Sequence, residues 1–527
     1  MLDIIIKNAR IIDGEGTPEF VSDITVKDGI IVAVEKTNQR ASEIIDAEGM
    51  AAAPGFIDVH GHTDIFAFID PDRSSKLCQG ITTELCGQCG LGPAPISHEH
   101  YAVYEGYLGT LGAFPYPTGK DFTTFKAFLD FMETMPLGIN TAYFLPHGTL
   151  RMSAMGLSPE SPSQKQLYHM KSMIREGMEA GALGLSSGLG YAPGMFADEA
   201  ELTALCTVVG EFGGIYSSHV RNQGRLIEAC VEETIRVAKN SNSRANIAHT
   251  KASGKMNWGK IPSLIKMIHE ADIEVMHDVY PYTATSTILR ATLPPYLQQL
   301  TPQSILEYLK NPQHHAELKN AIFDPSADFE SPLYDCGYGG LMIFNPLKTK
   351  DVAGKSIEQY AAEKGMDPFD AYLSLLIENE LSAGYIGFSI SENDVEKLLA
   401  DPLCMIGTDA LYVQGMPVTH PRAIGTFPRV LGRYVREAKL ITLEEAIRKM
   451  TSLPARFYGL HNKGILRAGM DADIVVFDSE KITDHADYHQ SLLPNEGIHR
   501  VIVNGKTAVS DDKALGIRNG KVLRASR

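Results

Sequence analysis

Between residues 54 and 463 the chain alternates short apolar runs with longer amphipathic stretches. The short runs are typical of buried strands, and the longer ones carry apolar residues at spacings of three and four, which is typical of helices. The predicted strands are Gly55–His60, Ile81–Cys86, Ile139–Leu145, Ala182–Ser187, Gly214–His219, Ala245–His249, Ile273–His277 and Cys404–Thr408. The clearest predicted helices are Gln164–Glu179, Asp198–Phe212, Gly224–Lys239 and Ile261–Glu270.

This alternation predicts an α/β fold with a parallel sheet. Eight strands are also the number that closes a (β/α)8 barrel of the TIM type, and we place the barrel at residues 54–463. A doubly wound open sheet is the alternative. It is less favoured because chemically rich residues follow nearly every predicted strand, whereas an open sheet gathers its ligands at one crevice.

Both ends of the chain show a different pattern, in which short strands are separated by Gly, Asp and Asn. Three N-terminal strands are expected, at Leu2–Ala9, Asp23–Lys27 and Gly29–Val34. Two C-terminal strands are expected at Asp473–Asp478 and His499–Gly505, and the second ends in an Asn-Gly hairpin signal. We expect residues 1–53 and 464–527 to form one small β-sandwich. Two unrelated β appendages are the alternative.

The interval between the last two barrel strands, from about Ser286 to Leu403, is too long for a single crossover. We therefore expect an inserted subdomain at residues 288–342. Helices of the barrel are expected to return at Ser356–Lys364 and Pro368–Glu380.

Composition narrows the possible functions. The chain has 527 residues and a net charge of −16, which argues against binding to nucleic acid or to an anionic membrane and leaves a small molecule as the expected partner. The seven cysteines are scattered, which is typical of a reducing compartment. The N-terminus lacks the pattern of a signal peptide, and no apolar run approaches the length of a membrane span. A cytoplasmic location is therefore expected.

The strongest chemical signal is His60–Gly61–His62 at the end of the first predicted barrel strand. In an extended backbone, residues i and i+2 point the same way, so both rings can face one divalent metal ion. The alternative is a pair of solvated histidines without a metal. It is favoured for the second His-x-His motif, His98–Glu99–His100, which lies in a predicted loop.

Cys86 ends the second predicted strand, and Cys89 follows it three residues later. A redox motif would precede a helix, and a zinc ribbon would need a second cysteine pair; neither context is present. A thiolate is a good zinc ligand and can bridge two metal ions. Cys89 is the better candidate, because Cys86 still belongs to the strand.

Two more histidines, His219 and His249, end the fifth and sixth predicted strands, which favours metal ligation over a structural role. His277 ends the seventh strand and is ambiguous. Asp409 follows the eighth strand, where a carboxylate beside a metal-activated water can accept and return a proton. The alternative for Asp409 is a helix cap or a turn.

These motifs resemble those of the amidohydrolase superfamily and, within it, the N-acyl-D-amino-acid deacylases (D-aminoacylases). The resemblance covers nearly the whole chain. The matching segments are PGFIDVHGHTD (54–64), GITTELCGQCG (80–90), GALGLSSGLGYAPG (181–194), HVRNQG (219–224), HTKASG (249–254), DVYPYTATS (278–286), GTDA (407–410), HPRAIGTFPRVLG (420–432) and GMDADIVVFD (469–478).

The resemblance implies a zinc-dependent hydrolysis of the amide bond of N-acyl-D-amino acids. It implies one tight zinc ion held by Cys89, His219 and His249, and a second, weaker metal position at His60 and His62 that Cys89 can bridge. Asp409 would be the general base and acid. Residues that would bind the substrate are Tyr191, Lys251, Tyr280, Ser286 and Arg422, with Arg422 suited to a bidentate grip on the α-carboxylate.

Cyclic amidases of the same superfamily, such as hydantoinases and dihydroorotases, bridge their metals with a carboxylated lysine on the fourth strand. The fourth predicted strand here contains no lysine, which favours the deacylase branch. Two positions depart from the family pattern: Gln88 stands where Asn is usual, and Gln223 where Glu is usual. A cyclic amidase, another amidohydrolase on the same scaffold and a non-catalytic scaffold remain the alternatives, and the oligomeric state is left open.

Overall fold

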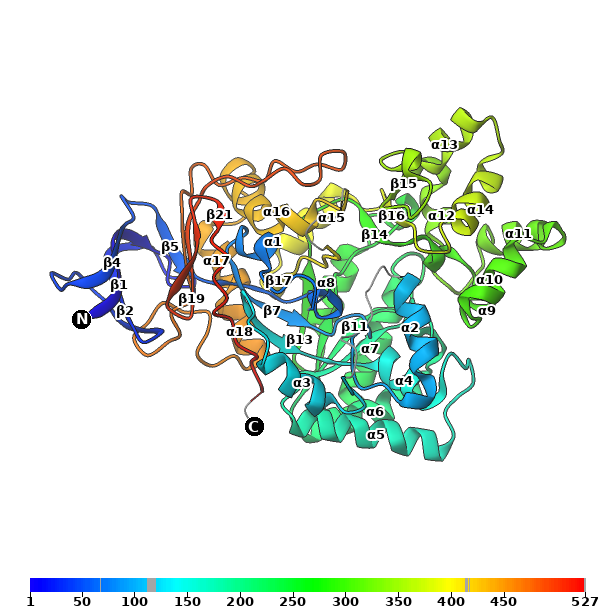
Figure 1. Cartoon of the computed structure of the whole chain (residues 1–527), viewed down its shortest axis with the longest axis horizontal. Helices are drawn as coiled ribbons and strands as arrows, with labels where there is room; N and C mark the ends of the chain where they lie inside the picture. The colour runs from blue at the N-terminus through cyan, green and yellow to red at the C-terminus, as the bar shows by residue number, and fades with distance from the viewer. Residues whose placement is uncertain (67, 111–119, 413–415, 417, 526–527) are drawn as a thin grey trace.

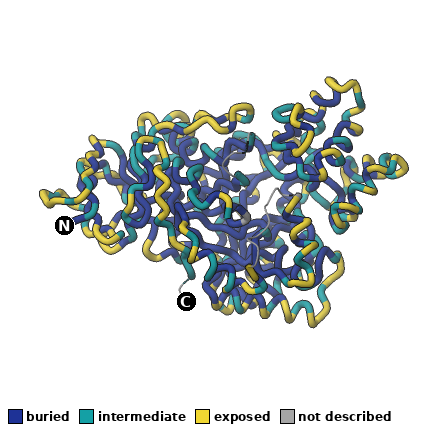
Figure 2. Tube along the Cα trace, viewed as in Figure 1, coloured by how far each residue is buried: buried dark blue, intermediate teal, exposed yellow. Residues whose placement is uncertain are grey.

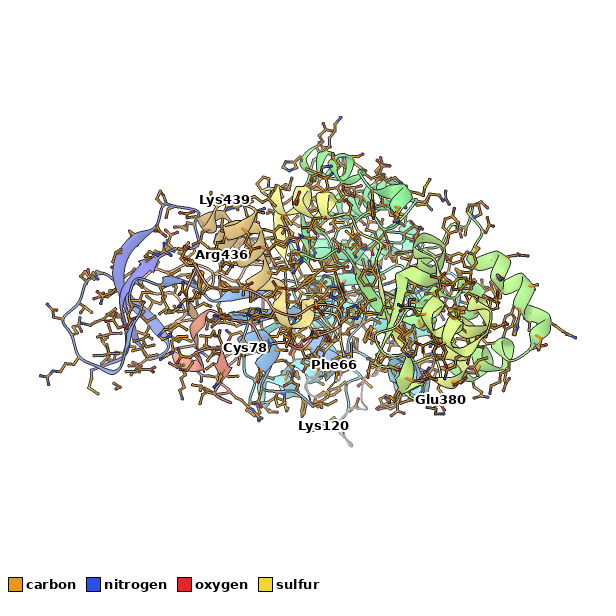
Figure 3. All side chains as sticks on the ribbon, turned by 90° about the horizontal axis from the view of Figure 1, so that it is seen from above. Phe66, Cys78, Lys120, Glu380, Arg436 and Lys439 are labelled. Carbon is orange, nitrogen blue, oxygen red and sulfur yellow. The ribbon has the colours of Figure 1, made fainter. Side chains whose placement is uncertain are left out.

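The structure is a computed structural model that describes residues 1–66, 68–110, 120–412, 416 and 418–525. Parallel strands form the centre of the molecule, the terminal strands pair at one end, and a helical insertion projects at the other (Figure 1). A view from above shows the same order, with the barrel between the terminal strands and the insertion (Figure 3). The predicted fold class is therefore confirmed.

The barrel strands occur where the apolar runs predicted them. They are β6 (Phe56–Asp58), β7 (Ile81–Cys86), β8 (Asn140–Tyr143), β10 (Gly184–Gly188), β11 (Ile215–His219), β12 (Arg244–Ile247), β13 (Val275–Val279) and β17 (Cys404–Ile406). Neighbouring strands pair in parallel in two series. The first is β6-β7-β8, and the second starts at the short strand β9 (Leu145–Pro146) and runs β9-β10-β11-β12-β13-β17.

Two junctions close these strands into a ring. The short strand β9 (Leu145–Pro146) continues β8 after one intervening residue, and the amide of Leu183 donates to the carbonyl of Tyr143 at 2.9 Å. At the other junction the first strand meets the last, because the amide of Asp409 donates to the carbonyl of His60 at 2.8 Å. A parallel bridge between Gly61 and Ala410 continues that contact.

Helices cover the outside of the barrel, and their apolar faces pack against the strands. The residues between them form the buried interior seen in Figure 2. The capping residues Ser163 and Asp198 begin two of the predicted helices. No helix of the described residues is long and apolar enough to cross a membrane. The helices of the barrel region are α1 (Ser74–Leu77), α2 (Tyr101–Thr110), α3 (Phe125–Glu133), α4 (His147–Met155), α5 (Gln164–Glu179), α6 (Glu199–Glu211), α7 (Ile227–Ser241), α8 (Ile261–His269), α15 (Glu392–Ala400), α16 (Arg422–Arg429), α17 (Leu443–Met450) and α18 (Ser452–Tyr458).

The two ends of the chain share one nine-stranded sheet. The joining pair is antiparallel and sets Ile474 opposite Pro54 and Phe477 opposite Ala51. Asn504 and Gly505 both have positive φ, 45° and 79°, which is the geometry of the tight hairpin that the Asn-Gly signal predicts. The strands of this sheet are β1 (Leu2–Ile11), β2 (Phe20–Lys27), β3 (Ile30–Val34), β4 (Ala41–Asp46), β5 (Ala51–Pro54), β18 (Ile474–Phe477), β19 (Ile498–Val503), β20 (Lys506–Ser510) and β21 (Lys513–Ala514).

The insertion is built on a three-stranded antiparallel sheet in the order β14-β16-β15. Its own hydrophobic cluster extends from Leu289 to Tyr385, beyond the predicted end at residue 342, because the two helices assigned to the barrel pack here instead. Its elements are β14 (Thr285–Ile288), α9 (Pro295–Gln298), α10 (Pro302–Leu309), α11 (His315–Ile322), α12 (Pro332–Cys336), β15 (Leu341–Phe344), α13 (Ile357–Lys364), α14 (Pro368–Glu378) and β16 (Gly384–Gly387).

The carboxylate of Asp401, which precedes the last barrel strand, contacts residues of α8 and β13. Asp401 lies 2.7 Å from His269 Nε2 and 3.3 Å from His277 Nε2, and it accepts the amide of Leu403 at 2.8 Å. Burial raises the pKa of Asp401, but the hydrogen bonds and charge of the histidines outweigh burial and hold that pKa well below its usual range. His277 therefore faces a structural carboxylate.

We expect Asp401→Asn to lower the free energy of unfolding at neutral pH by about 1.5–3 kcal/mol, the usual contribution of hydrogen bonds to a charged group. Because the pKa of Asp401 is lower in the folded protein, its stabilisation is complete above the unfolded pKa of about 3.9 and is lost as the pH falls below it. Urea unfolding of both proteins down to about pH 3 should show the difference shrinking below about pH 4.

The matched control is Asp272→Asn, which removes an exposed carboxylate 2.7 Å from Lys239 and should change stability little. Equal losses in the two variants, or a difference that persists unchanged in acid, would contradict the role of Asp401.

Candidate active site

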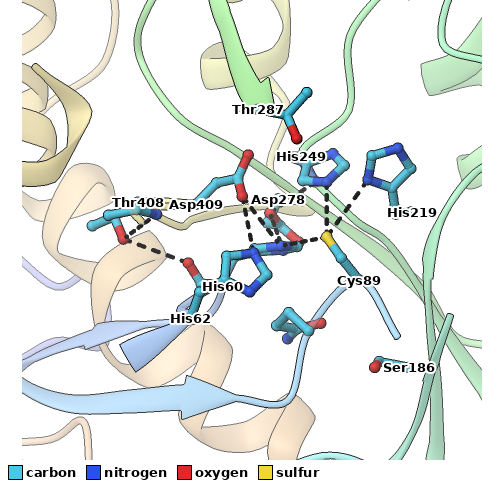
Figure 4. A network of polar contacts seen from close by, with 12 residues as sticks. His60, His62, Cys89, Ser186, His219, His249, Asp278, Thr287, Thr408 and Asp409 are labelled. Carbon is cyan, nitrogen blue, oxygen red and sulfur yellow. Dashed lines mark hydrogen bonds and ion pairs between the residues drawn. The ribbon is translucent and has the colours of Figure 1, made fainter. Parts of the chain in front are cut away.

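The residues predicted for metal binding and proton transfer lie together at the mouth of the barrel, where the carboxyl ends of five strands meet (Figure 4). His60 follows β6, Cys89 follows β7, His219 ends β11, His249 follows β12 and Asp409 follows β17. All of them are buried. Residues that are remote in sequence meet here because parallel strands all end at the same face of a barrel.

The Cys89 sulfur lies at the centre of the cluster. It is 3.3 Å from His60 Nε2, 3.3 Å from His249 Nε2 and 3.5 Å from His219 Nδ1. His62 joins from the other side, with its Nε2 3.1 Å from Asp409 Oδ1. The structure therefore brings together all six residues that the sequence proposed for metal binding and proton transfer.

The donor atoms fit a metal ion. Potential ligand atoms of His60, Cys89, His249 and Asp409 all lie within 4.8 Å of one another. Imidazole nitrogen, thiolate sulfur and carboxylate oxygen are the ligands that zinc takes in proteins. These four residues include ligands from both expected metal positions: His249 from the tight one and His60 from the weaker one. Cys89 is common to both positions.

The protonation states of two of these residues, Cys89 and His249, also suit metal binding. Burial raises the pKa of Cys89, but the nearby charge of His60 and hydrogen bonds from histidines hold that pKa well below its usual range, so the sulfur is a thiolate. Burial, together with the charge of Lys251, lowers the pKa of His249 to about 3 and keeps its ring neutral. The neutral imidazole is the form that ligates a metal.

Three of these residues adopt a backbone that L-residues rarely adopt. The φ angles are 54° at Cys89, 35° at His249 and 48° at Asp409. Each such conformation costs roughly 1–2 kcal/mol. Each of these residues lies two or three positions after the end of a strand. The strained backbone turns the chain sharply there and points the side chain into the mouth of the barrel.

A second layer of side chains orients the first, and the sequence did not identify its role. Asp278 Oδ1 lies 3.4 Å from His60 Nδ1 and accepts the amide of His249 at 2.9 Å. The Gln223 amide nitrogen and the Lys251 ammonium nitrogen each lie 3.0 Å from His249 Nδ1. These contacts turn Nε2 of His60 and Nε2 of His249 toward Cys89. Gln223 had drawn attention only as a departure from the family pattern.

Beneath the cluster lies a buried ionic group that the sequence analysis missed. Lys76 Nζ is 2.6 Å from Asp58 Oδ2 and 3.0 Å from Glu84 Oε1, and it donates to Thr408 Oγ1 at 2.7 Å. Asp58 also accepts the amides of Thr408 at 2.8 Å and His60 at 3.2 Å. The sequence carries one sign of this buried group, because Asp58 stands two residues before His60 in the same predicted strand.

A cavity opens onto the cluster, and all five residues expected to bind substrate line it. Arg422 Nη1 lies 2.9 Å from Asp409 Oδ2, and the guanidinium stacks 4.6 Å from the centre of the Tyr280 ring. Tyr191 packs its ring against His219 and donates its hydroxyl to Thr287. Lining residues that the sequence did not single out are Leu91, Thr285, Thr287, Ala291, Glu330, Pro332, Tyr385 and Leu411.

The remaining sequence motifs lie apart from the cluster. The second His-x-His motif forms a 3-10 helix on which the side chain of His98 is 80% exposed. Cys86 is buried within β7 and lies 3.8 Å from the Thr63 hydroxyl. Burial and the charge of Glu84 raise the pKa of Cys86 well above its usual value, which makes it an inert core residue.

Comparison with known proteins agrees with this geometry. The model of the Amidohydrolase family matches residues 43–257 and 354–509. The chain belongs to the amidohydrolase family. The family expected from the sequence motifs is thus confirmed.

Members of this family with known activities cover almost the whole chain. N-acyl-D-glutamate deacylase of Alcaligenes xylosoxydans xylosoxydans is 35% identical over 99% of this chain and 96% of its own length. D-aminoacylase of the same organism is 31% identical over 99% of this chain and 97% of its own. A crystal structure of N-acyl-D-glutamate deacylase from Bordetella bronchiseptica, with zinc and a phosphonate inhibitor, has a TM-score of 0.83 and 33% identity, covering 99% of this chain and all of that one.

We expect Lys76→Met to destabilise this amidohydrolase strongly. The change leaves Asp58 and Glu84 buried without their cation, and breaking a buried ion pair costs about 3–5 kcal/mol. Chemical denaturation monitored by circular dichroism measures the loss. The matched control is Lys126→Met, which removes an exposed lysine paired with Asp130 and should shift the midpoint little. Similar midpoints for the two variants would contradict the importance of the buried group.

Proposed function

We propose that this protein is a zinc-dependent deacylase that hydrolyses N-acyl-D-amino acids to a carboxylate and a free D-amino acid. The observation that carries the proposal is the Cys89 sulfur, which lies within 3.5 Å of three histidine rings at the floor of a cavity that also exposes Asp409 and Arg422. The deacylases named above match this chain from end to end, which supports the same chemistry.

Cys89, His219 and His249 would hold the tight zinc ion, and His60 and His62 would complete a second, weaker position. Bound there, zinc supplies Lewis-acid activation of water at neutral pH. The Cys89 thiolate would bring negative charge to the metal in place of a carboxylated lysine. Asp278 and Gln223 keep the rings of His60 and His249 turned toward the sulfur.

Asp409 is the proton carrier in this proposal. Its carboxylate faces the cavity and is held by His62 and Arg422. Burial raises the pKa of Asp409, but the charge of Arg422 and contacts with the histidines keep the pKa well below its usual value, so the group is ionised and ready to accept a proton. It would take the proton of the attacking water and return it to the leaving nitrogen.

The cations of the cavity would bind the substrate carboxylate. Arg422 presents a planar fork suited to bidentate binding, and Lys251 adds a second positive charge on the same wall. Tyr191, Tyr280 and Ser286 would complete the contacts around the amide. Because Arg422 also touches Asp409, the carboxylate site and the proton carrier are joined in one unit.

Two observations weigh against the alternatives. The fourth barrel strand, β10, contains no lysine that could be carboxylated, which disfavours a cyclic amidase. The complete set of ligand and acid–base residues disfavours a non-catalytic scaffold. We also propose that the protein acts in the cytoplasm on a small molecule rather than on nucleic acid or a membrane, in line with its net charge of −16 and scattered cysteines.

A pair of variants separates ligand from proton carrier. Asp409→Asn should keep the tight zinc ion and lower kcat by about 10²–10⁴-fold, the usual contribution of a general acid–base group. Cys89→Ala should lose both zinc and turnover, whereas Cys86→Ala, which alters a cysteine outside the cluster, should keep its zinc. Atomic absorption and steady-state kinetics measure the two quantities. Turnover at the unaltered rate in Asp409→Asn would refute the assigned role.

Substrate class is tested with N-acetyl-D-amino acids, their L-enantiomers, hydantoin and dihydroorotate. We expect release of free amino acid from the D-series alone, because one fixed carboxylate grip sets the orientation of the chiral carbon. Hydrolysis of a ring substrate in the absence of activity on any acyl-D-amino acid would favour the cyclic amidase.

A further inference from the structure

The insertion contributes an acidic side chain to the cavity of the barrel. Glu330 lies just before α12, away from every barrel strand, yet it lines the same cavity as Lys251, Asp409 and Arg422. Its Oε2 accepts the backbone amide of Gln223 at 3.2 Å, which fixes the carboxylate at the cavity wall.

The cations of the cavity already have partners. Lys251 Nζ lies 3.0 Å from Gln223 Oε1, and Arg422 is paired with Asp409 and donates to the carbonyl of Ser286 at 3.1 Å. Within the described residues, no lysine, arginine or histidine forms an ion pair with Glu330 within 4.0 Å. Glu330 therefore forms no direct ion pair with a basic side chain, although its charge favours the protonated form of Lys251.

A neighbouring group responds to this charge. Burial and then the carboxylate of Glu330 raise the pKa of Asp335 to about 7. Burial is the larger cause of this shift, and the carboxylate of Glu330 adds a negative potential at Asp335.

Largely apolar side chains also line this cavity. They offer contact to a chain of methylene groups, which would end near the carboxylate. The residues concerned are Leu91, Ala291, Pro332, Tyr385 and Leu411.

We propose that Glu330 selects substrates whose side chain carries a positive charge, such as N-acyl-D-lysine, and rejects those with an acidic side chain. This inference rests on the proposed deacylase function. If Lys251 and Arg422 hold the α-carboxylate, a second carboxylate on the substrate side chain meets Glu330 with no cation left to receive it. A side-chain ammonium instead forms a charge-assisted hydrogen bond there. The specificity therefore differs from that of the N-acyl-D-glutamate deacylases that this chain resembles.

The test measures kcat/KM of the zinc-loaded full chain for two pairs of substrates matched in shape. N-acetyl-D-lysine is compared with N-acetyl-D-norleucine, and N-acetyl-D-glutamine with N-acetyl-D-glutamate. We expect the first member of each pair to be favoured by about tenfold or more, equivalent to about 1.4 kcal/mol. Competitive inhibition by free D-lysine, compared with D-norleucine, should show the same order.

Glu330→Gln removes the charge and keeps the shape, so both ratios should fall toward one. Asp328→Asn, an exposed carboxylate in the same loop that does not line the cavity, should leave both ratios unchanged. Preference for D-glutamate over D-glutamine in the unaltered protein, or ratios that survive in Glu330→Gln, would overturn this inference and leave the deacylase function standing. Failure to hydrolyse any of the four substrates, while ring amides are cleaved, would overturn both.

Discussion

The carboxylate of Asp58 joins the first and last strands of the barrel. It accepts the amide and hydroxyl of Thr408 and the ammonium of Lys76, all within 2.8 Å. A ring of parallel strands forms only when its two ends meet in the correct register, and no loop enforces that meeting. A buried charge without partners would be prohibitively costly, so the register in which these groups pair is the one that the fold adopts. His60 and Asp409, each next to this junction, are positioned by it.

The chemistry of the mouth depends on that register. Cys89 reaches three histidine rings only because the strands that carry them are aligned at their ends. The thiolate would then supply negative charge to a metal ion bound beside it. Cys89, His249 and Asp409 keep an unfavourable left-handed backbone. The surrounding structure holds this conformation, which directs the three side chains into the cluster.

The barrel and the insertion both contribute side chains to the cavity. In the proposed reaction the barrel would supply the metal ligands, the proton carrier and the groups that bind the carboxylate. The insertion adds Glu330, Tyr385 and the strand that carries Ser286 to the wall of the cavity. The insertion has its own hydrophobic cluster, so its side chains can change without disturbing the register of the barrel. Such a separation would allow one reaction to be adapted to substrates of different charge.

The sequence by itself determined the alternation of strands and helices, the hairpin at Asn504–Gly505, the family, and the residues that meet at the mouth, because each of these depends on local spacing along the chain. Only the tertiary structure decided the partners of Lys76, the orientation of His60 by Asp278, the extent of the insertion and the entry of Glu330 into the cavity. These depend on packing between segments far apart in the sequence. No periodicity records such contacts, because they are set by how the strands close and by which buried charges must find partners.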